Sequence, residues 1–214
     1  TDGIVIPGTR PQVAAQICST SPGEAFCAWS DPAYGPFVLK LNRAGIAPSW
    51  PVAGQPISAG GSPNGLSISA DGTGGAYVAW SINGDVYAQR FLSSGAIAPS
   101  WPINGLLVCS ASGSQIEPAI ATTSTGAAII AWRDYRLGQG NQTDIFAQKI
   151  LPNAAMPPSA PINGIAICTQ ASNQTAVAVV PIGADGALIA WQDERSGSSG
   201  VFAQYVKDDF SLDA

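Results

Sequence analysis

The chain has 214 residues, a net charge of −5, 11% charged and 46% hydrophobic residues, and no histidine. This composition argues against a nucleic-acid surface or an anionic-membrane surface, both of which need clustered Lys and Arg. The lack of histidine excludes a Ser-His-Asp triad and every zinc site that requires His. No apolar run approaches the length of a spanning helix, about 20 residues, so we expect no membrane insertion and no cofactor or metal.

The first strands of the chain contain two of its four cysteines. The opening segment Asp2-Gly3-Ile4-Val5-Ile6 has the pattern of a strand, and a hairpin follows around Ser21-Pro22-Gly23-Glu24. A turn centred on Pro22-Gly23 would place Cys18 opposite Cys27. The sequence therefore allows a Cys18–Cys27 disulfide, with two small buried thiols as the alternative. Cys109 and Cys168 occupy equivalent places in successive repeats, too far apart to bridge, and we expect both to be buried.

An Ala-Trp pair then recurs along the chain and defines a repeat. The tryptophans Trp29, Trp80, Trp132 and Trp191 lie 51, 52 and 59 residues apart. Each ends the second strand of a predicted hairpin, and a third strand such as Asp144-Ile145-Phe146-Ala147-Gln148 follows. A connector then leads to a fourth strand, which opens at Gly54, Asn104-Gly105 or Asn163-Gly164. Self-similarity at about 50 residues predicts an all-β propeller with one four-stranded antiparallel blade per repeat.

The strand count predicts four blades within a single domain, 1–214. Blade 1 covers about 11–58, blade 2 about 63–110 and blade 3 about 115–169. Blade 4 covers about 174–207 and lacks a fourth strand, which residues 2–8 would supply. Closing the ring in this way would hide the sheet edges. Two alternatives remain open: two chains forming an eight-bladed ring, and repeats cut from a longer array.

The repeat resembles a known group. Ala131-Trp132-Arg133-Asp134-Tyr135-Arg136 followed by Asp144–Gln148, and Ala190–Arg195 followed by Phe202–Gln204, look like the tandem β-propeller repeat of large secreted and surface proteins of environmental bacteria. The resemblance covers nearly the whole chain. It implies a repeat protein of bacterial origin, secreted or at the cell surface.

Six residues are candidates for ligand binding. Trp50 and Trp101 lie in Pro-flanked connectors, where an exposed ring could stack on a sugar or could instead cover the edge of its own blade. The pairs Asp134/Arg136 and Asp193/Arg195 directly follow the Trp strands. They could hold a sugar or an acidic group, or could brace the following loop. The loops after the Trp strands vary most in length, as binding loops on a rigid scaffold do.

These features predict a non-enzymatic structural or adhesion module, a rigid scaffold in an extracellular or cell-surface assembly. The expected partners are other protein subunits or an extracellular polysaccharide. A glycan-binding, lectin-like propeller is the alternative. A carboxylate-dependent glycosidase is a third hypothesis and ranks below the other two. Such an enzyme needs two facing carboxyl groups, but no acidic cluster repeats along the chain. No catalytic residue is therefore assigned.

Overall fold

The computed structural model describes residues 5–6, 11–58, 60–137 and 142–213. These residues form four antiparallel sheets in chain order. The first contains β1 (Val13–Ser21), β2 (Glu24–Asp31), β3 (Gly35–Asn42), β4 (Gly45–Ile46) and β5 (Gln55–Pro56), and the second contains β6 (Leu66–Ala70), β7 (Ala76–Ile82), β8 (Asp85–Phe91) and β9 (Leu106–Cys109). The third contains β10 (Gln115–Thr122), β11 (Ala128–Asp134), β12 (Asp144–Ile150) and β13 (Ile165–Cys168), and the fourth contains β14 (Gln174–Ile182), β15 (Gly186–Asp193) and β16 (Gly200–Val206).

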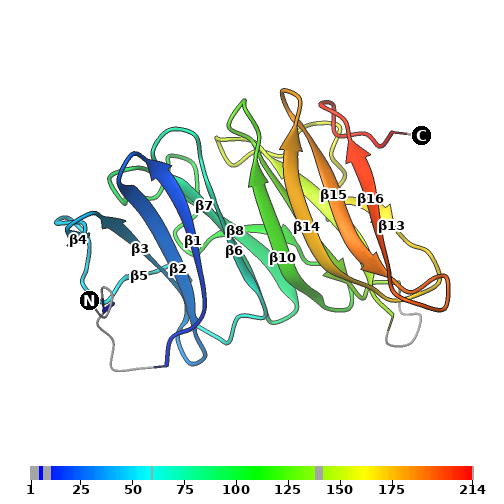
Figure 1. The fold of residues 1–214 in the computed structure, drawn as a ribbon, viewed down its shortest axis with the longest axis horizontal. Coiled ribbons are helices and arrows are strands. Elements are labelled where there is room, and N and C mark those ends of the chain that lie inside the picture. Colours follow the sequence, from blue (N-terminus) through cyan, green and yellow to red (C-terminus); the bar gives the residue numbers. More distant parts are fainter. Residues whose placement is uncertain (1–4, 7–10, 59, 138–141, 214) are drawn as a thin grey trace.

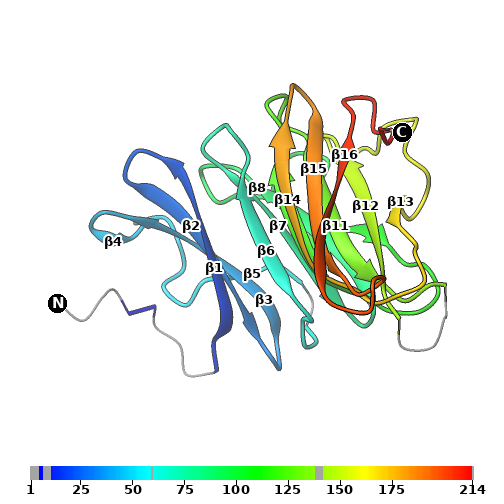
Figure 2. The ribbon, with the colours of Figure 1, turned by 45° about the vertical axis from the view of Figure 1, so that its right-hand side comes forward.

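The four sheets follow one another in a row, with the first and last sheets at opposite ends (Figures 1 and 2). The strands β1, β6, β10 and β14 are neighbours from one sheet to the next and form the inner edge of the row. The prediction of an all-β chain built from one sheet per Ala-Trp repeat is confirmed. Within the described ranges, no helix is long and apolar enough to cross a membrane.

The second and third sheets pack their two faces against different neighbours. From the second sheet to the fourth, the face that carries the repeated Trp contacts the preceding sheet, and in the second and third sheets the opposite face contacts the next one. In the second sheet, for example, Val78 and Trp80 pack against the first sheet, while Tyr77 and Ala79 pack against the third. This follows from strand geometry, because successive side chains point to opposite faces. Three apolar cores therefore lie between four sheets.

A conformational irregularity recurs at the start of the inner strands. Ala14, Glu117 and Ala176 have φ values of 53°, 52° and 51°, and a register shift lies at each of them. Gly65 occupies the equivalent position before β6, with φ of 88°. Non-glycine residues adopt positive φ rarely and at a cost of about 1–2 kcal/mol. Because the same bulge occurs in three repeats, it is a regular feature of the repeat. A bulge bends the strand that contains it, here the inner strand of each sheet.

The predicted ring closure is not found among the described residues. The fourth sheet has three strands, and Ile6 packs against the core between the first and second sheets. The rest of the predicted closing strand, residues 2–4 and 7–8, lies outside the described residues. The coarser prediction, four antiparallel sheets, holds without closure.

Of the two alternatives for Cys18 and Cys27, the structure has the free thiols, as it does for Cys109 and Cys168. Ser21 pairs with Glu24, as a Pro22-Gly23 turn requires, but Ser19 then pairs with Ala25. The extra residue shifts the register by one, so Cys18 lies opposite Phe26 instead of Cys27. A shift of one residue sends the two side chains to opposite faces of the sheet.

Candidate functional site at the rim of the third sheet

Asp134 is the hub of a buried polar cluster where β11 ends. Its carboxylate accepts hydrogen bonds from the Trp132 indole at 2.7 Å and from the backbone N–H of Arg136 at 2.8 Å. The Arg136 guanidinium donates to the same carboxylate at 2.7 Å and to the Asn163 carbonyl at 2.8 Å. It also stacks 3.8 Å from the centre of the Phe146 ring. The Asp134/Arg136 pair therefore holds together the Trp132 side chain, the loop that follows β11 and the segment that leads into β13. This is the loop-bracing role, one of the two that the sequence left open.

The fourth sheet repeats this arrangement with one difference. Asp193 accepts hydrogen bonds from the Trp191 indole, from the backbone N–H of Arg195 and from Ser172, and it forms an ion pair with Arg195. The Arg195 hydrogen bond is the main cause that holds the pKa of Asp193 well below its ordinary value. The Arg195 side chain is 30% exposed, against 15% for Arg136. Arg195 is therefore the more accessible of the two arginines.

Asp144, the first residue of β12, completes the cluster of the third sheet. It lies directly opposite Asp134 in the register of β11 and β12. The equivalent pairs elsewhere have at most one acid each: Asp31 with Gly35, Ile82 with Asp85, and Asp193 with Gly200. Directly opposed side chains have Cβ atoms about 4.5–5.5 Å apart. We call Asp134, Arg136 and Asp144 the rim cluster. It is the one place in the described sheets where two carboxyl groups face each other across a strand pair.

Burial raises the pKa of Asp144 to about 6, and the Asp134 carboxylate adds to this effect while Arg136 opposes it. A raised pKa means that the folded protein favours the neutral carboxyl group. A carboxyl group that changes charge near pH 6 can hold a proton and release it under mild conditions. The two acids thus differ in their surroundings: Asp134 forms an ion pair with Arg136 at 2.7 Å, whereas burial raises the pKa of Asp144.

This shift predicts a pH dependence of stability. The protonated Asp144 stabilises the fold fully below its unfolded pKa of 3.8, and this contribution is lost as the pH rises through about 6. Asp144→Asn keeps the neutral form at every pH. We therefore expect the variant to gain stability relative to the native protein between about pH 4 and pH 7, as measured by thermal unfolding of both proteins across that range. A difference in Tm that does not change with pH would contradict the assignment.

Glu117 is the acid that the described inner strands contribute. It lies at the bulge of β10 and accepts a hydrogen bond from Arg133 at 2.8 Å. Its side chain is 47% exposed. Its backbone N–H bonds to the Asn64 carbonyl, which fixes it against the second sheet. Glu117 is therefore a positioned and accessible carboxylate on the inner edge, on the same sheet as the rim cluster.

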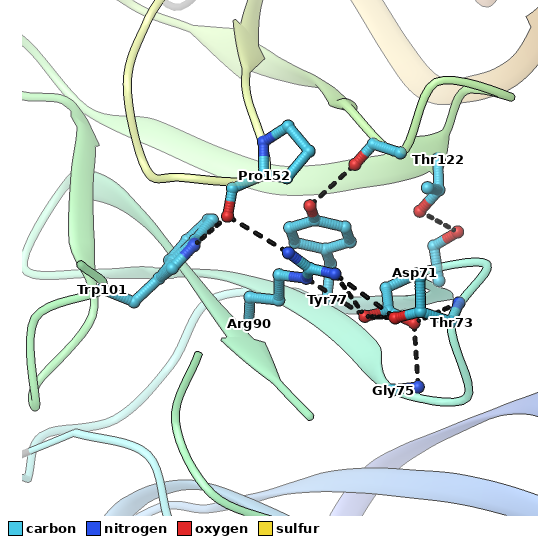
Figure 3. Close-up of polar contacts among 10 residues, drawn as sticks. Asp71, Thr73, Gly75, Tyr77, Arg90, Trp101, Thr122 and Pro152 are labelled. Carbon is cyan, nitrogen blue, oxygen red and sulfur yellow. Dashed lines mark hydrogen bonds and ion pairs between the residues drawn. The ribbon is translucent and has the colours of Figure 1, made fainter. Parts of the chain in front are cut away.

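The structure places Trp50 and Trp101 in contacts between sheets, so neither offers a free ring face to a sugar. Both are only 6% exposed. The Trp50 ring meets Phe26 edge-on at 5.3 Å. Trp101 packs against Tyr77 at 5.6 Å, and its indole N–H donates to the Pro152 carbonyl at 3.0 Å (Figure 3). The Pro-rich connectors fold back onto the cores, where the rings fill space between sheets.

A second polar network, which sequence reasoning missed, joins the second and third sheets near Trp101 (Figure 3). Asp71 accepts two hydrogen bonds from Arg90 and others from the backbone N–H groups of Thr73 and Gly75. Burial by itself would raise the pKa of Asp71, but these hydrogen bonds outweigh it and lower the pKa. Arg90 also donates to the Pro152 carbonyl of the third sheet. This network is saturated and serves to hold the sheets together.

The described residues contain no group of His, Cys, Asp and Glu side chains arranged to hold a metal ion. Sequence reasoning also missed Asp144 and Glu117. The signal for Asp144 was available, since only the third repeat has an acid both two residues after its Trp and at the start of its third strand.

Comparison with known proteins identifies relatives of the fold only. No family model matches the sequence, and no curated protein matches it. Among solved structures, the alpha-L-arabinanase of Penicillium chrysogenum, complexed with arabinobiose, is similar with a TM-score of 0.52 and 9% identity, over 91% of this chain and 62% of that one. The endo-1,4-beta-xylanase of Bacteroides thetaiotaomicron has a TM-score of 0.49 and 9% identity, over 96% and 75%. The GH43 protein BlXynB of Bacillus licheniformis has 0.48 and 14%, over 95% and 43%.

The arabinanase match supports a β-propeller fold, and this chain spans less than two thirds of that protein's length. The prediction of a non-enzymatic structural module is contradicted by this likeness, because the protein that shares the fold is named as an arabinanase. The sequence argument failed because it looked for acids repeated in every blade. A catalytic site needs its carboxyl groups in one place only.

Proposed function

We propose that the chain is a carbohydrate-active propeller that hydrolyses a polysaccharide built of pentose units. The observation that carries the proposal is Asp144, a buried carboxyl group whose pKa is raised to about 6 and which lies opposite Asp134 in the strand register. Glycoside hydrolysis requires two carboxyl groups, one of which holds a proton for the leaving group. The arabinanase that shares the fold supports the substrate class.

In this proposal Asp144 donates the proton to the departing glycosidic oxygen. The second carboxylate, the base or nucleophile at the sugar carbon, has to face the acid across about 5–10 Å. Glu117 does not meet this requirement, because it pairs with Arg133, whose side chain leaves β11 on the face opposite to Asp134 and Asp144. Asp134 is a positioning residue, since Arg136, Trp132 and a backbone N–H occupy both of its oxygens.

The location and partner follow from the same proposal. A polymeric substrate is too large to enter a cell, which supports an extracellular or cell-surface location and a polysaccharide partner. Because the four thiols are free, disulfide bonding gives this location no support.

The test is the release of reducing ends from linear arabinan and from linear xylan. The Asp144→Asn variant should lose at least about 100-fold in kcat, the usual contribution of a general acid. The native rate should fall as the pH rises through about 6, because the donor loses its proton. Asp85→Asn is the matched control, since Asp85 occupies the Asp144 position in the second sheet but faces Ile82.

Two results would overturn the proposal. One is the absence of reducing ends from both polymers with a folded native protein. The other is an Asp144→Asn variant that retains the native rate and pH profile.

A further inference from the structure

A small pocket lies at the end of β7, between the second sheet and the connector that leads to it from the first sheet. Its volume is about 180 Å³. A cavity for one water needs only about 10–15 Å³, so this pocket has room for a small molecule. The described residues that line it carry no charge: Ser58, Gly60, Trp80, Ile82, Asn83, Tyr87 and Asn104.

Two buried hydrogen-bonding groups at this pocket lack a partner. The Trp80 side chain is fully buried, and its indole N–H has no acceptor among the described residues. The Ser58 hydroxyl is likewise buried without a partner in that part of the chain. In the third sheet the equivalent indole, that of Trp132, donates to Asp134 at 2.7 Å, and the fourth sheet repeats this bond. A buried donor without an acceptor is unfavourable, so the two groups point to a ligand with acceptor oxygens.

The second sheet lacks the ion pair that the third sheet has at this place. Ile82 stands at the position of Asp134, two residues after the repeated Trp. The strands β7 and β8 are joined by Asn83-Gly84 alone, so this short turn provides no equivalent of Arg136. The chain therefore supplies neither the carboxylate nor the cation of the pair.

The walls that hold Arg136 in the third sheet are nevertheless present in the second. The Arg136 guanidinium stacks 3.8 Å from the centre of the Phe146 ring and donates to the Asn163 carbonyl at 2.8 Å. Tyr87 and Asn104 are the equivalents of these two residues, and both line the pocket. The pocket thus combines an aromatic face and a carbonyl for a cation with an indole N–H for a carboxylate.

The charges around the pocket favour a ligand that carries both signs. An ion of one sign would lie against uncharged walls without a counter-ion, which is unfavourable for a buried charge. A ligand with both charges brings its own partner, as Asp134 and Arg136 are partners at 2.7 Å. Burial raises the pKa of Tyr87, and the Asp85 carboxylate raises it further. Because the charge of Asp85 reaches this ring, the cation belongs over Tyr87 and the carboxylate at Trp80.

We propose that this pocket binds a small zwitterion in which a guanidinium or ammonium group lies next to a carboxylate. The carboxylate accepts hydrogen bonds from the Trp80 indole and the Ser58 hydroxyl. The cation lies on the Tyr87 ring and donates to the Asn104 carbonyl, as Arg136 donates to its equivalent in the third sheet. The pocket is on a different sheet from the rim cluster, and the proposal is independent of the hydrolytic activity.

The first test follows the indole N–H signal of Trp80 by NMR while guanidinoacetate or glycine is added to the full chain. We expect a saturable downfield shift, with the signals of Trp132 and Trp191 unchanged because their N–H groups already have acceptors. Acetate and methylguanidinium, which each carry only one of the charges, should bind about 10-fold more weakly, the worth of about one hydrogen bond. No shift with either zwitterion would overturn the proposal, as would saturation by uncharged arabinose at the same concentrations.

Variants of the walls test whether the binding occurs in this pocket. Tyr87→Leu and Ser58→Ala should each weaken guanidinoacetate binding by about 5- to 10-fold, through the loss of a cation–π contact and of a hydrogen bond. Phe37→Leu is the matched control, because Phe37 stacks on the repeated Trp of the first sheet as Tyr87 does in the second. This control should bind as the native protein does. Native affinity in Tyr87→Leu would contradict the proposed site.

Ile82→Asp tests the two halves of the site separately, because it supplies the carboxylate from within the chain. Once circular dichroism shows that the variant is folded, we expect it to bind methylguanidinium about 10-fold more tightly than the native protein does. It should also bind acetate more weakly, since the new carboxylate takes the place of the anion. A folded Ile82→Asp protein with native affinities for both ions would refute the arrangement. If the variant does not fold, the Tyr87 and Ser58 variants decide.

Discussion

Asp134→Ala is expected to lower the free energy of unfolding by about 3–5 kcal/mol, the usual cost of removing one partner of a buried ion pair. The Asp134 side chain is inaccessible to solvent, and three donor groups converge on it. Without the carboxylate, the Arg136 charge and the Trp132 indole N–H remain buried without this acceptor. The measurement is urea unfolding followed by tryptophan fluorescence and by circular dichroism.

Asp193→Ala is the matched comparison, because Asp193 has the same partners one repeat later. Arg195 is twice as exposed as Arg136, at 30% against 15%, so its guanidinium can turn toward water in the adjoining pocket. We expect a loss of about 1–3 kcal/mol, the cost of leaving polar groups partly unsatisfied. Equal losses in the two variants would show that exposure of the arginine does not set the cost.

Gly105→Val should destabilise the protein by about 2–5 kcal/mol, through two additive causes. The residue has φ of +92°, where a branched side chain is strained. A Cβ would also lie 2.5 Å from the Trp80 ring, which is fully buried and cannot move aside. The expected result is a large fall in Tm, measured by calorimetry, with the ring environment of Trp80 disturbed in the near-ultraviolet dichroism.

Gly197→Val separates the two causes, since Gly197 has φ of +80° but nothing within 4 Å of its would-be Cβ. Backbone strain alone should cost about 1–2 kcal/mol there. If Gly197→Val proves as damaging as Gly105→Val, the close approach of Gly105 to Trp80 is not important for stability.

The sequence was most informative where local patterns repeat. The Ala-Trp spacing predicted four hairpin-based sheets, and it correctly placed the fourth strands after Gly54, Asn104-Gly105 and Asn163-Gly164. The Trp positions in the cores follow from the alternation of side chains along a strand. These features depend on neighbours in the chain, so one sequence is enough to read them.

Predictions failed where the outcome depends on a single extra residue or on distant contacts. One unpaired residue before Ser21 removed the geometry for a Cys18–Cys27 bridge. For Trp50 and Trp101 the sequence left open an exposed ring or a ring that covers its own blade, and contacts with Phe26 and Tyr77 bury both. Asp144 gains its raised pKa from burial and from Asp134, which the fold brings opposite it. The contacts of the two tryptophans leave no local pattern in the sequence, whereas the two acids of the third repeat do.

The alternation of a Trp-bearing face and an opposite face in every sheet has an engineering consequence. Each interface joins the Trp-bearing face of one sheet to the opposite face of the sheet before it. The protein could therefore be lengthened by inserting whole repeats, one sheet at a time. Duplicating the segment from Gln115 to Asn173 would insert one unit and recreate every junction it interrupts. A cut inside a hairpin would separate two strands that pair, so the seam before each inner-strand Gln is a natural place for recombination.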